Sequence, residues 1–364
     1  MSALPEEPRL VGVPGLDPQR LKRPSGTAGP HAASPDGAKP IVQPAKAEAR
    51  PPLEIPTPSR FADPLFTSLI LLAAISLFAI VGLIVMSLVT RSRESLQQFG
   101  WRFFVQSVWD PVAGQFGALP FIYGTLVSSL LALALAVPLG VGVALFNTEV
   151  CPRRLRSLLS FTVELLAAIP SVIYGLWGIF VLAPVLRKFV EPWLKANLGW
   201  TGIFTGPPFG IGMLAAGLIL AIMVIPIVAS ITREVVMAVP SQQREAALAL
   251  GATRWEMLRI SVLRNARVGI MGGVILGLGR AIGETMAVTM VIGNTPQISK
   301  SLLAPGDTLA SVIANQFSEA TGSIYLGALV EIGLALFIIT LIVNTLARML
   351  VWSVTRGMPS RAHA

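Results

Sequence analysis

The chain is poor in the residues that build disulfides and metal sites. Its 364 residues include one cysteine, Cys151, and two histidines, His31 and His363, which are far apart. A single cysteine excludes a disulfide within the chain, and no Cys/His spacing typical of a zinc site occurs. We therefore expect neither a structural nor a catalytic metal in this chain.

Charged residues are also scarce, at 13% of the chain, whereas soluble domains have roughly 25%. Hydrophobic residues make up 53%, and the mean hydropathy is +0.70. Six apolar blocks each exceed the roughly 20 residues with which a helix crosses a bilayer. They lie at about 64–90, 121–147, 158–184, 209–232, 266–293 and 324–352. The composition predicts an all-α, polytopic membrane protein with six transmembrane helices.

The formal net charge of +9 is distributed in a way that indicates membrane orientation rather than a nucleic-acid partner. In the loops and flanks near the apolar blocks, fourteen Lys and Arg residues fall on one side and seven on the other. The richer side includes Arg153, Arg154, Arg156 and the loop 233–267, and it is predicted to be cytoplasmic. Both termini are then cytoplasmic, membrane lipid surrounds the spans, and no nucleic acid is expected.

Residues 1–62 differ in composition from the rest of the chain. They are rich in Pro and Ala and have almost no aromatic residues, so they cannot bury enough apolar surface to fold. No apolar core follows a short basic start, which argues against a cleaved signal peptide. The sequence predicts a disordered cytoplasmic tail over 1–62 and a transmembrane domain over 63–355.

The longest predicted cytoplasmic segment, 233–267, is expected to form a helical elbow. Ser241 is a good N-cap for a first short helix, and Gly251 can end that helix in the left-handed conformation. Thr253 and Glu256 then have the T-x-x-E spacing of a capping box, which predicts the start of a second short helix. Because the elbow is held between two membrane spans, it fits a cleft on a partner protein better than a DNA groove.

The stretch EAALALG, Glu245–Gly251, resembles the E-A-A-x-x-x-G signature of the permease subunits of ABC importers. It also falls where that family has it, in the cytoplasmic loop two spans from the C-terminus. The resemblance implies an ABC type I importer permease (MetI-like) fold in a bacterial inner membrane. It further implies that Glu245, Ala246, Ala247 and Gly251 couple the chain to an ATPase subunit.

Two other stretches, ELLAAIPSVIYGLWG (Glu164–Gly178) and GLGRAIGETMAVTMVIGN (Gly277–Asn294), are similar to PstC-type permease subunits of phosphate importers. The similarity covers about 63–355, with one departure: where the wider family has I-x-L-P, residues 261–264 read S-V-L-R. It implies a sister permease of the PstA type, two ATPase subunits of the PstB type and an extracytoplasmic phosphate-binding protein of the PstS type. The chain contains no G-x-x-x-x-G-K-[ST] motif, so ATP and Mg are expected on the separate ATPase subunits. This chain itself is then not an enzyme.

Arg280 and Glu284 stand inside the fifth apolar block, where charges are costly and usually mark a pathway. Their spacing predicts one helix face shared with Gly273 and Gly277, and we expect this face to line a substrate pathway. Arg280 offers an oxyanion a forked, permanent charge, whereas Glu284 can pair with Arg280 or accept a hydrogen bond from protonated phosphate. The alternative is an intramembrane ion pair that only holds helices together.

Two further acids lie within the apolar blocks. Glu164 is near the inner end of the third block, and Glu331 is near the outer end of the sixth. Each is either part of the transport pathway or solvated at a membrane interface. We include Glu164 with Arg280 and Glu284 in the candidate pathway and leave Glu331 open.

The leading interpretation is a permease subunit of an ATP-driven importer of inorganic phosphate. Within the same family, the alternative is a permease for another oxyanion, such as sulfate or molybdate. Outside it, an ion-coupled carrier or channel would suit six spans and a buried charge pair, but it leaves the elbow at Gly251 unexplained. A membrane enzyme is a weaker alternative, because the apolar blocks contain no nucleophile–base pair or metal set.

Overall fold

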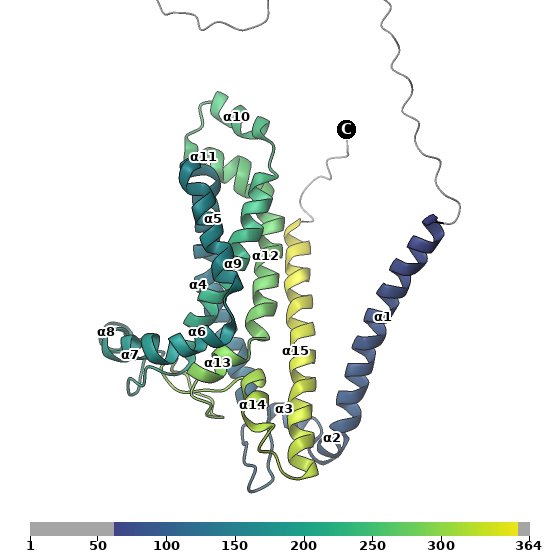
Figure 1. Ribbon diagram of the computed structural model, residues 1–364. Coiled ribbons are helices and arrows are strands. Elements are labelled where there is room, and N and C mark those ends of the chain that lie inside the picture. The colour runs from purple at the N-terminus through teal and green to yellow at the C-terminus, as the bar shows by residue number, and fades with distance from the viewer. Residues whose placement is uncertain (1–61, 356–364) are drawn as a thin grey trace, which may run out of the picture. The chain divides into compact units, whose positions relative to one another are not determined.

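A computed structural model describes residues 62–355, and the regular structure in that range is helical (Figure 1). Six helical stretches are long and apolar enough to cross a membrane: Asp63–Arg91, Leu119–Val150, Ser171–Thr201, Met213–Met237, Arg254–Ile282 and Ser323–Ser353. The prediction of an all-α membrane protein with six spans is therefore confirmed. The predicted tail, 1–62, lies outside the described residues except for Ala62.

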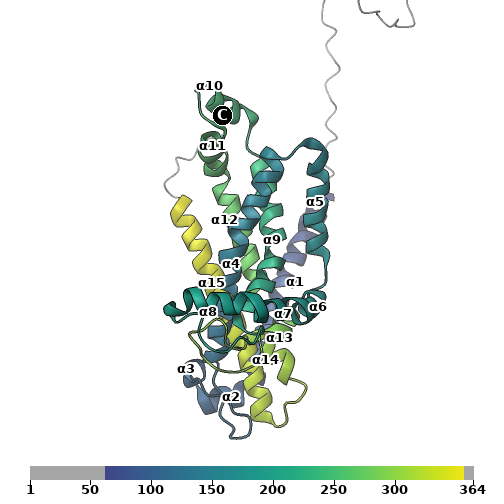
Figure 2. The same ribbon diagram turned by 90° about the vertical axis from the view of Figure 1, so that its left-hand side faces the viewer.

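The helices before the elbow are α1 (Ala62–Arg91), α2 (Arg93–Phe99), α3 (Arg102–Val105), α4 (Leu119–Leu145), the π-helix η2 (Phe146–Val150), α5 (Arg153–Ala168), α6 (Ser171–Trp177), η3 (Gly178–Leu182), α7 (Ala183–Val185), η4 (Leu186–Val190), α8 (Glu191–Leu198), η5 (Gly199–Thr201) and α9 (Met213–Met237). The elbow and the helices after it are α10 (Ser241–Ala249), α11 (Arg254–Met257), η6 (Leu258–Leu263), α12 (Arg264–Ile282), α13 (Met286–Val291), α14 (Leu309–Gln316) and α15 (Ser323–Thr355). Figures 1 and 2 show α4, α9 and α12 side by side, with the elbow at one end of this group.

Small residues allow α12 to pack closely against α9. A Cβ added to Gly277 would lie 2.8 Å from Val224 Cγ1, and one added to Gly273 would lie 3.2 Å from Ile231 Cγ2. Such close approach lets helices associate in lipid, where apolar burial gives no driving force. Gly273 and Gly277 therefore face α9, and the prediction that they line a pathway is wrong.

The third apolar block is split at Pro170 instead of forming one straight span over 158–184. Pro170 has no backbone N–H and restricts the residue before it to extended geometry, and Ile169 accordingly has ψ 128°. As a result α5 runs alongside α9, whereas α6 to α8 run across the direction of the long helices (Figure 2). This turn places the end of α5 and the start of α6 beside the middle of α9.

The fifth apolar block is also broken, after Ile282. Gly283 ends α12, and the chain resumes a helix only at Met286, the first residue of α13. The prediction that Arg280 and Glu284 share one continuous helix face is therefore wrong. Arg280 lies in the last turn of α12, and Glu284 lies in the break. Irregular backbone at membrane depth is tolerated where protein surrounds it.

The segment that leads into α14 crosses α4 at Gly124. A Cβ on Gly124 would lie 1.9 Å from the carbonyl oxygen of Asp307, and Leu309 N donates to Thr125 Oγ1 at 3.0 Å. The Asp307 carboxylate accepts hydrogen bonds from Thr308 N and from a serine hydroxyl of α14. Burial raises the pKa of the Asp307 carboxyl to about 6, since the charged form loses hydration there. This crossing has room for glycine alone.

We expect Gly124→Ala to destabilise the chain by about 1–3 kcal/mol, the usual cost of forcing an extra methyl into a packed site. The matched control is Gly142→Ala in the same helix, where an added Cβ meets nothing within 4 Å. Thermal unfolding of both variants in detergent measures the difference. Equal melting temperatures for the two variants would show that the crossing at Asp307 adjusts without cost.

Candidate functional site

Arg280 and Glu284 form an ion pair across the helix break. Arg280 Nη2 lies 3.2 Å from Glu284 Oε2, and Ala287 N donates to Glu284 Oε1 at 3.3 Å. The Arg280 side chain is 51% exposed, whereas that of Glu284 is 4% exposed. Glu284 thus has one oxygen on Arg280 and the other on the first turn of α13. The geometry makes Glu284 the group that orients Arg280, and Arg280 the group that is open to a ligand.

A cavity of about 300 Å³ lies beside Arg280, between α5, α6, α9 and α12. The other lining residues are apolar apart from one tyrosine; they are Leu166, Ala167, Ile169, Tyr174, Met223 and Ile227. The Tyr174 hydroxyl donates to Leu166 O at 2.8 Å and so closes the turn at Pro170. Arg280 is therefore the one charged side chain among the described residues that line the cavity, and its half-exposed guanidinium is open to an anion.

Glu164 does not line this cavity. Its Oε1 lies 3.6 Å from Arg233 Nη1 of α9, beside a small space that Asn147 and Ser160 also line. The structure thus separates Glu164 from the Arg280–Glu284 pair, although all three were expected in one pathway. The sequence did not predict the role of Arg233, because its partner Glu164 lies about seventy residues earlier in the chain. Nothing in the sequence around Arg233 indicates that the two residues are in contact.

Glu331 is fully buried between α15 and α2. Ser95 Oγ donates to Glu331 Oε2 at 2.5 Å, and Oε1 has no hydrogen-bond partner among residues 62–355. The alternative of a carboxylate solvated at the interface is therefore wrong for Glu331. It also lies outside the lining of the Arg280 cavity.

The elbow has the predicted turn but not two short helices. Gly251 has φ +83°, and Thr253 and Glu256 form the expected capping box, with Glu256 N donating to Thr253 Oγ1 and Thr253 N to Glu256 Oε2. The first helix begins at Ser241 itself, so Ser241 is not its N-cap. After α11 the chain continues through η6 directly into α12. Arg264 stands where the wider family has proline, and it keeps the N–H that a continuous helix needs.

The outer surface of the elbow combines charge with exposed apolar side chains. Glu245 and Ala246 are exposed, Leu250 is 90% exposed, and Trp255 is 64% exposed. Exposed apolar groups of this kind, ringed by polar ones, are typical of a protein interface. Ala247 differs from its neighbours, because it is half-buried and packs on the cluster beneath the elbow. Of the expected coupling residues, Ala247 therefore supports the elbow from inside.

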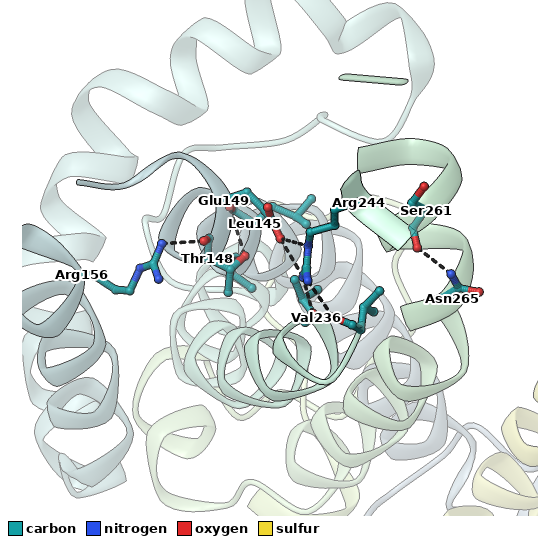
Figure 3. Close-up of polar contacts among 10 residues, drawn as sticks. Leu145, Thr148, Glu149, Arg156, Val236, Arg244, Ser261 and Asn265 are labelled. Atoms are coloured by element: carbon teal, nitrogen blue, oxygen red, sulfur yellow. Dashed lines mark hydrogen bonds and ion pairs between the residues drawn. The ribbon is translucent and has the colours of Figure 1, made fainter. Parts of the chain in front are cut away.

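Arg244 attaches the underside of the elbow to the membrane helices (Figure 3). Its guanidinium donates to Val236 O at 2.8 Å and to Val239 O at 2.6 Å, and Nη2 lies 3.0 Å from Glu149 Oε1. Val236 lies in the last turn of α9, and Val239 lies two residues beyond the end of that helix. Arg244 thus donates to carbonyls at a helix terminus, where the regular intrahelical hydrogen bonds end. Sequence reasoning missed this contact, since an arginine beside the E-A-A motif carries no sign of its partners.

Within residues 62–355, no three His, Cys, Asp or Glu side chains come together as a group able to hold a metal ion. What the fold brings together is one half-exposed arginine on an apolar cavity inside a helical membrane bundle, and an elbow shaped for a partner at its end. These features define an integral membrane subunit of a transport system.

Comparison with known proteins identifies the family. Residues 136–356 match the family described as binding-protein-dependent transport system inner membrane component. The phosphate transport system permease protein PstC of Mesorhizobium japonicum is 49% identical over 298 residues, which cover 80% of this chain and 91% of that protein. The PstC protein of Haemophilus influenzae is 46% identical, covering 79% and 93% of the two chains. The chain belongs to the family of binding-protein-dependent transport system inner membrane components.

Solved structures support the fold. A bacterial alginate ABC transporter in complex with a pentasaccharide-bound periplasmic protein contains a chain that aligns with a TM-score of 0.54 at 19% identity, covering 82% of this chain and 99% of that one. A second structure, of a bacterial ABC transporter involved in alginate import, gives a TM-score of 0.53 at 17% identity. At such low identity the likeness concerns architecture alone, and it confirms the ABC importer permease fold that the resemblance implied.

Proposed function

We propose that this chain is the permease subunit through which an ATP-driven ABC importer moves inorganic phosphate into the cytoplasm. The observation that carries the proposal is the half-exposed Arg280 guanidinium, held by the buried Glu284 on the wall of an otherwise uncharged cavity. The names of its relatives, which are phosphate transport system permeases, support phosphate as the anion.

Arg280 is the group that meets phosphate. Its planar fork matches two oxygens of a tetrahedral oxyanion, and it stays charged at any physiological pH. Glu284 keeps Arg280 in place and is closed to a ligand, because its side chain is 4% exposed and its oxygens face Arg280 and Ala287 N. It therefore acts as a positioning group for Arg280 and not as an acceptor for the proton of phosphate. Sulfate and molybdate would fit the same fork, so competition with these anions tests the substrate assignment.

The elbow provides the contact with an ATPase. Glu245, Ala246 and Gly251 stand on its outer surface, where they would meet one of two ATPase subunits that bind ATP and Mg. A sister permease would complete the pathway, and an extracytoplasmic phosphate-binding protein would deliver the substrate. In this arrangement the elbow and both termini are cytoplasmic, as the distribution of basic residues indicates. An ion-coupled carrier would have no use for such a surface.

Arg280→Gln should lower phosphate uptake by about tenfold to a hundredfold in complexes that still assemble, since a hydrogen bond to a charged group is worth ~1.5–3 kcal/mol. Glu284→Gln should cause a smaller loss, because the amide can still accept the hydrogen bond from Ala287 N. The double variant Arg280→Met/Glu284→Leu removes both charges of the pair, so no buried carboxylate is left unpaired, and it should assemble without transporting. The measurement is phosphate uptake per assembled complex. Normal uptake by the double variant would leave the pair with a structural role only.

Gly251→Val should separate transport from ATP hydrolysis, because a β-branched residue strongly disfavours φ +83°. An added Cβ meets nothing within 4 Å there, so the backbone conformation alone is perturbed. Gly202→Val is the matched control, with φ +75° and equally open space, in the segment after η5. ATPase subunits should co-purify poorly with Gly251→Val and normally with Gly202→Val. Retention of both the ATPase and coupled uptake by Gly251→Val would contradict the role assigned to the elbow.

Orientation can be tested with single cysteines in a Cys151→Ser background, because Cys151 itself is buried. Val150→Cys, at a site 63% exposed on the side of the elbow, should react with an impermeant thiol reagent only after the membrane is opened. Val112→Cys, at a site 99% exposed in the loop before α4, should react in intact cells. The reverse pattern would invert the orientation and place the elbow out of reach of a cytoplasmic ATPase.

A further inference from the structure

The π-helix η2, Phe146–Val150, lies where three structural elements meet. It ends with a hydrogen bond from Cys151 N to Phe146 O at 2.8 Å, which spans five residues instead of the usual four. It continues α4, contacts α5 and α9, and carries polar side chains that are turned toward both the elbow and α5.

The elbow is fastened to η2 by Arg244. The guanidinium lies 3.0 Å from Glu149 Oε1 while it also donates to Val236 O and Val239 O of the α9 end. Both side chains of the ion pair are largely buried, with 20% and 14% exposure. A displacement of α10, on which Arg244 stands next to the exposed Glu245, must therefore move η2 or break these bonds.

On its other side η2 is fastened to α5. Arg156 Nη2 donates to Thr148 O at 2.6 Å (Figure 3). Asn147 Nδ2 donates to Ser160 Oγ at 2.9 Å. Arg156 and Ser160 are one turn apart on α5, so this helix is held at two consecutive turns. The other end of α5 provides Leu166 and Ala167, two wall residues of the Arg280 cavity.

We propose that η2 relays movement of the elbow to α5, and through α5 to the cavity wall opposite Arg280. The inference rests on the proposed transport function and deepens it. Because α11, η6 and α12 are continuous, the elbow is already connected directly to Arg280 through one helical segment. The relay supplies a second connection, which runs from Arg244 through η2 and α5 to Leu166 and Ala167. One displacement at the elbow then shifts both walls of the cavity, so that the anion is released when they separate.

In this relay Arg244 and Arg156 are positioning residues. Arg244 must satisfy one carboxylate and two carbonyls from a single planar group, which the point charge of lysine cannot reproduce. Arg156 donates to one carbonyl on η2, and lysine can make that single bond. The two arginines thus differ in the substitution that each should tolerate.

The test compares Arg156→Gln with Arg153→Gln in the assembled transporter reconstituted with its binding protein. Both residues are arginines in the first turns of α5, but Arg153 is exposed and makes no hydrogen bond or ion pair within the described part of the chain. The readout is phosphate moved per ATP hydrolysed. We expect about a tenfold fall for Arg156→Gln, within the range that coupling contacts contribute, and no change for Arg153→Gln. Arg156→Lys should restore the ratio, whereas Arg244→Lys should remain as defective as Arg244→Gln.

Equal ratios for Arg156→Gln and the unmutated transporter would overturn the relay and leave α12 as the single line of coupling. Equal losses for Arg156→Gln and Arg153→Gln would also overturn it, because the effect would then follow charge rather than contact with η2. A failure of Arg156→Lys to restore the ratio would overturn it as well, because lysine can make the single hydrogen bond to Thr148 O on which the relay depends. Failure of the proposed function itself is distinguishable, since the unmutated transporter would then show no ATP-dependent phosphate uptake.

Discussion

A polar group that lies between the two membrane surfaces is costly unless it finds a partner inside the protein, because hydrocarbon supplies none. This constraint explains why the described chain is helical and why its irregular stretches are packed among helices. It also explains the pairing of acids at depth, where Glu284 is held by Arg280 and by a backbone N–H, and Glu331 by Ser95. Arg280 differs from these acids, because its guanidinium is paired with Glu284 and yet remains 51% exposed.

The helix break at Gly283 gives Arg280 its setting. In a continuous helix, Glu284 would lie one turn above Arg280 and both would face the same surface. The break instead turns Glu284 inward and leaves the guanidinium at the end of α12 beside an apolar wall. Discontinuous helices at substrate sites are common in membrane transporters, since they bring backbone and side-chain polar groups together at depth. The half-exposed guanidinium and the buried carboxylate that holds it are therefore both provided by a stretch of five residues, 280–284.

The sequence was sufficient to predict the features that depend only on residues adjacent in the chain. Apolar length predicted the six spans, and the left-handed glycine and T-x-x-E spacing predicted the turn at Gly251 and the box at Thr253. It was insufficient to predict the features that depend on packing against neighbouring helices. Pro138 and Pro226 stay inside helices, but Pro170 ends one, and nothing in the three local sequences separates these outcomes. The acidic partners of Arg233 and Arg244, Glu164 and Glu149, lie many residues away, so these ion pairs depend on helix packing that periodicity does not encode.

The π-helical turn at Phe146–Val150 also limits how this stretch of the chain can vary in length. A π-turn holds one residue more than the α-helical turn it replaces. Deleting a single residue there would convert the π-turn to an ordinary α-helical turn, and the side chains within the turn would point in other directions around the helix axis. Glu149 would then leave the elbow, and Thr148 would leave α5, although every span kept its hydrophobic length. A deletion in η2 would therefore leave each span long enough to cross the membrane but would break the contacts that η2 makes with its neighbours.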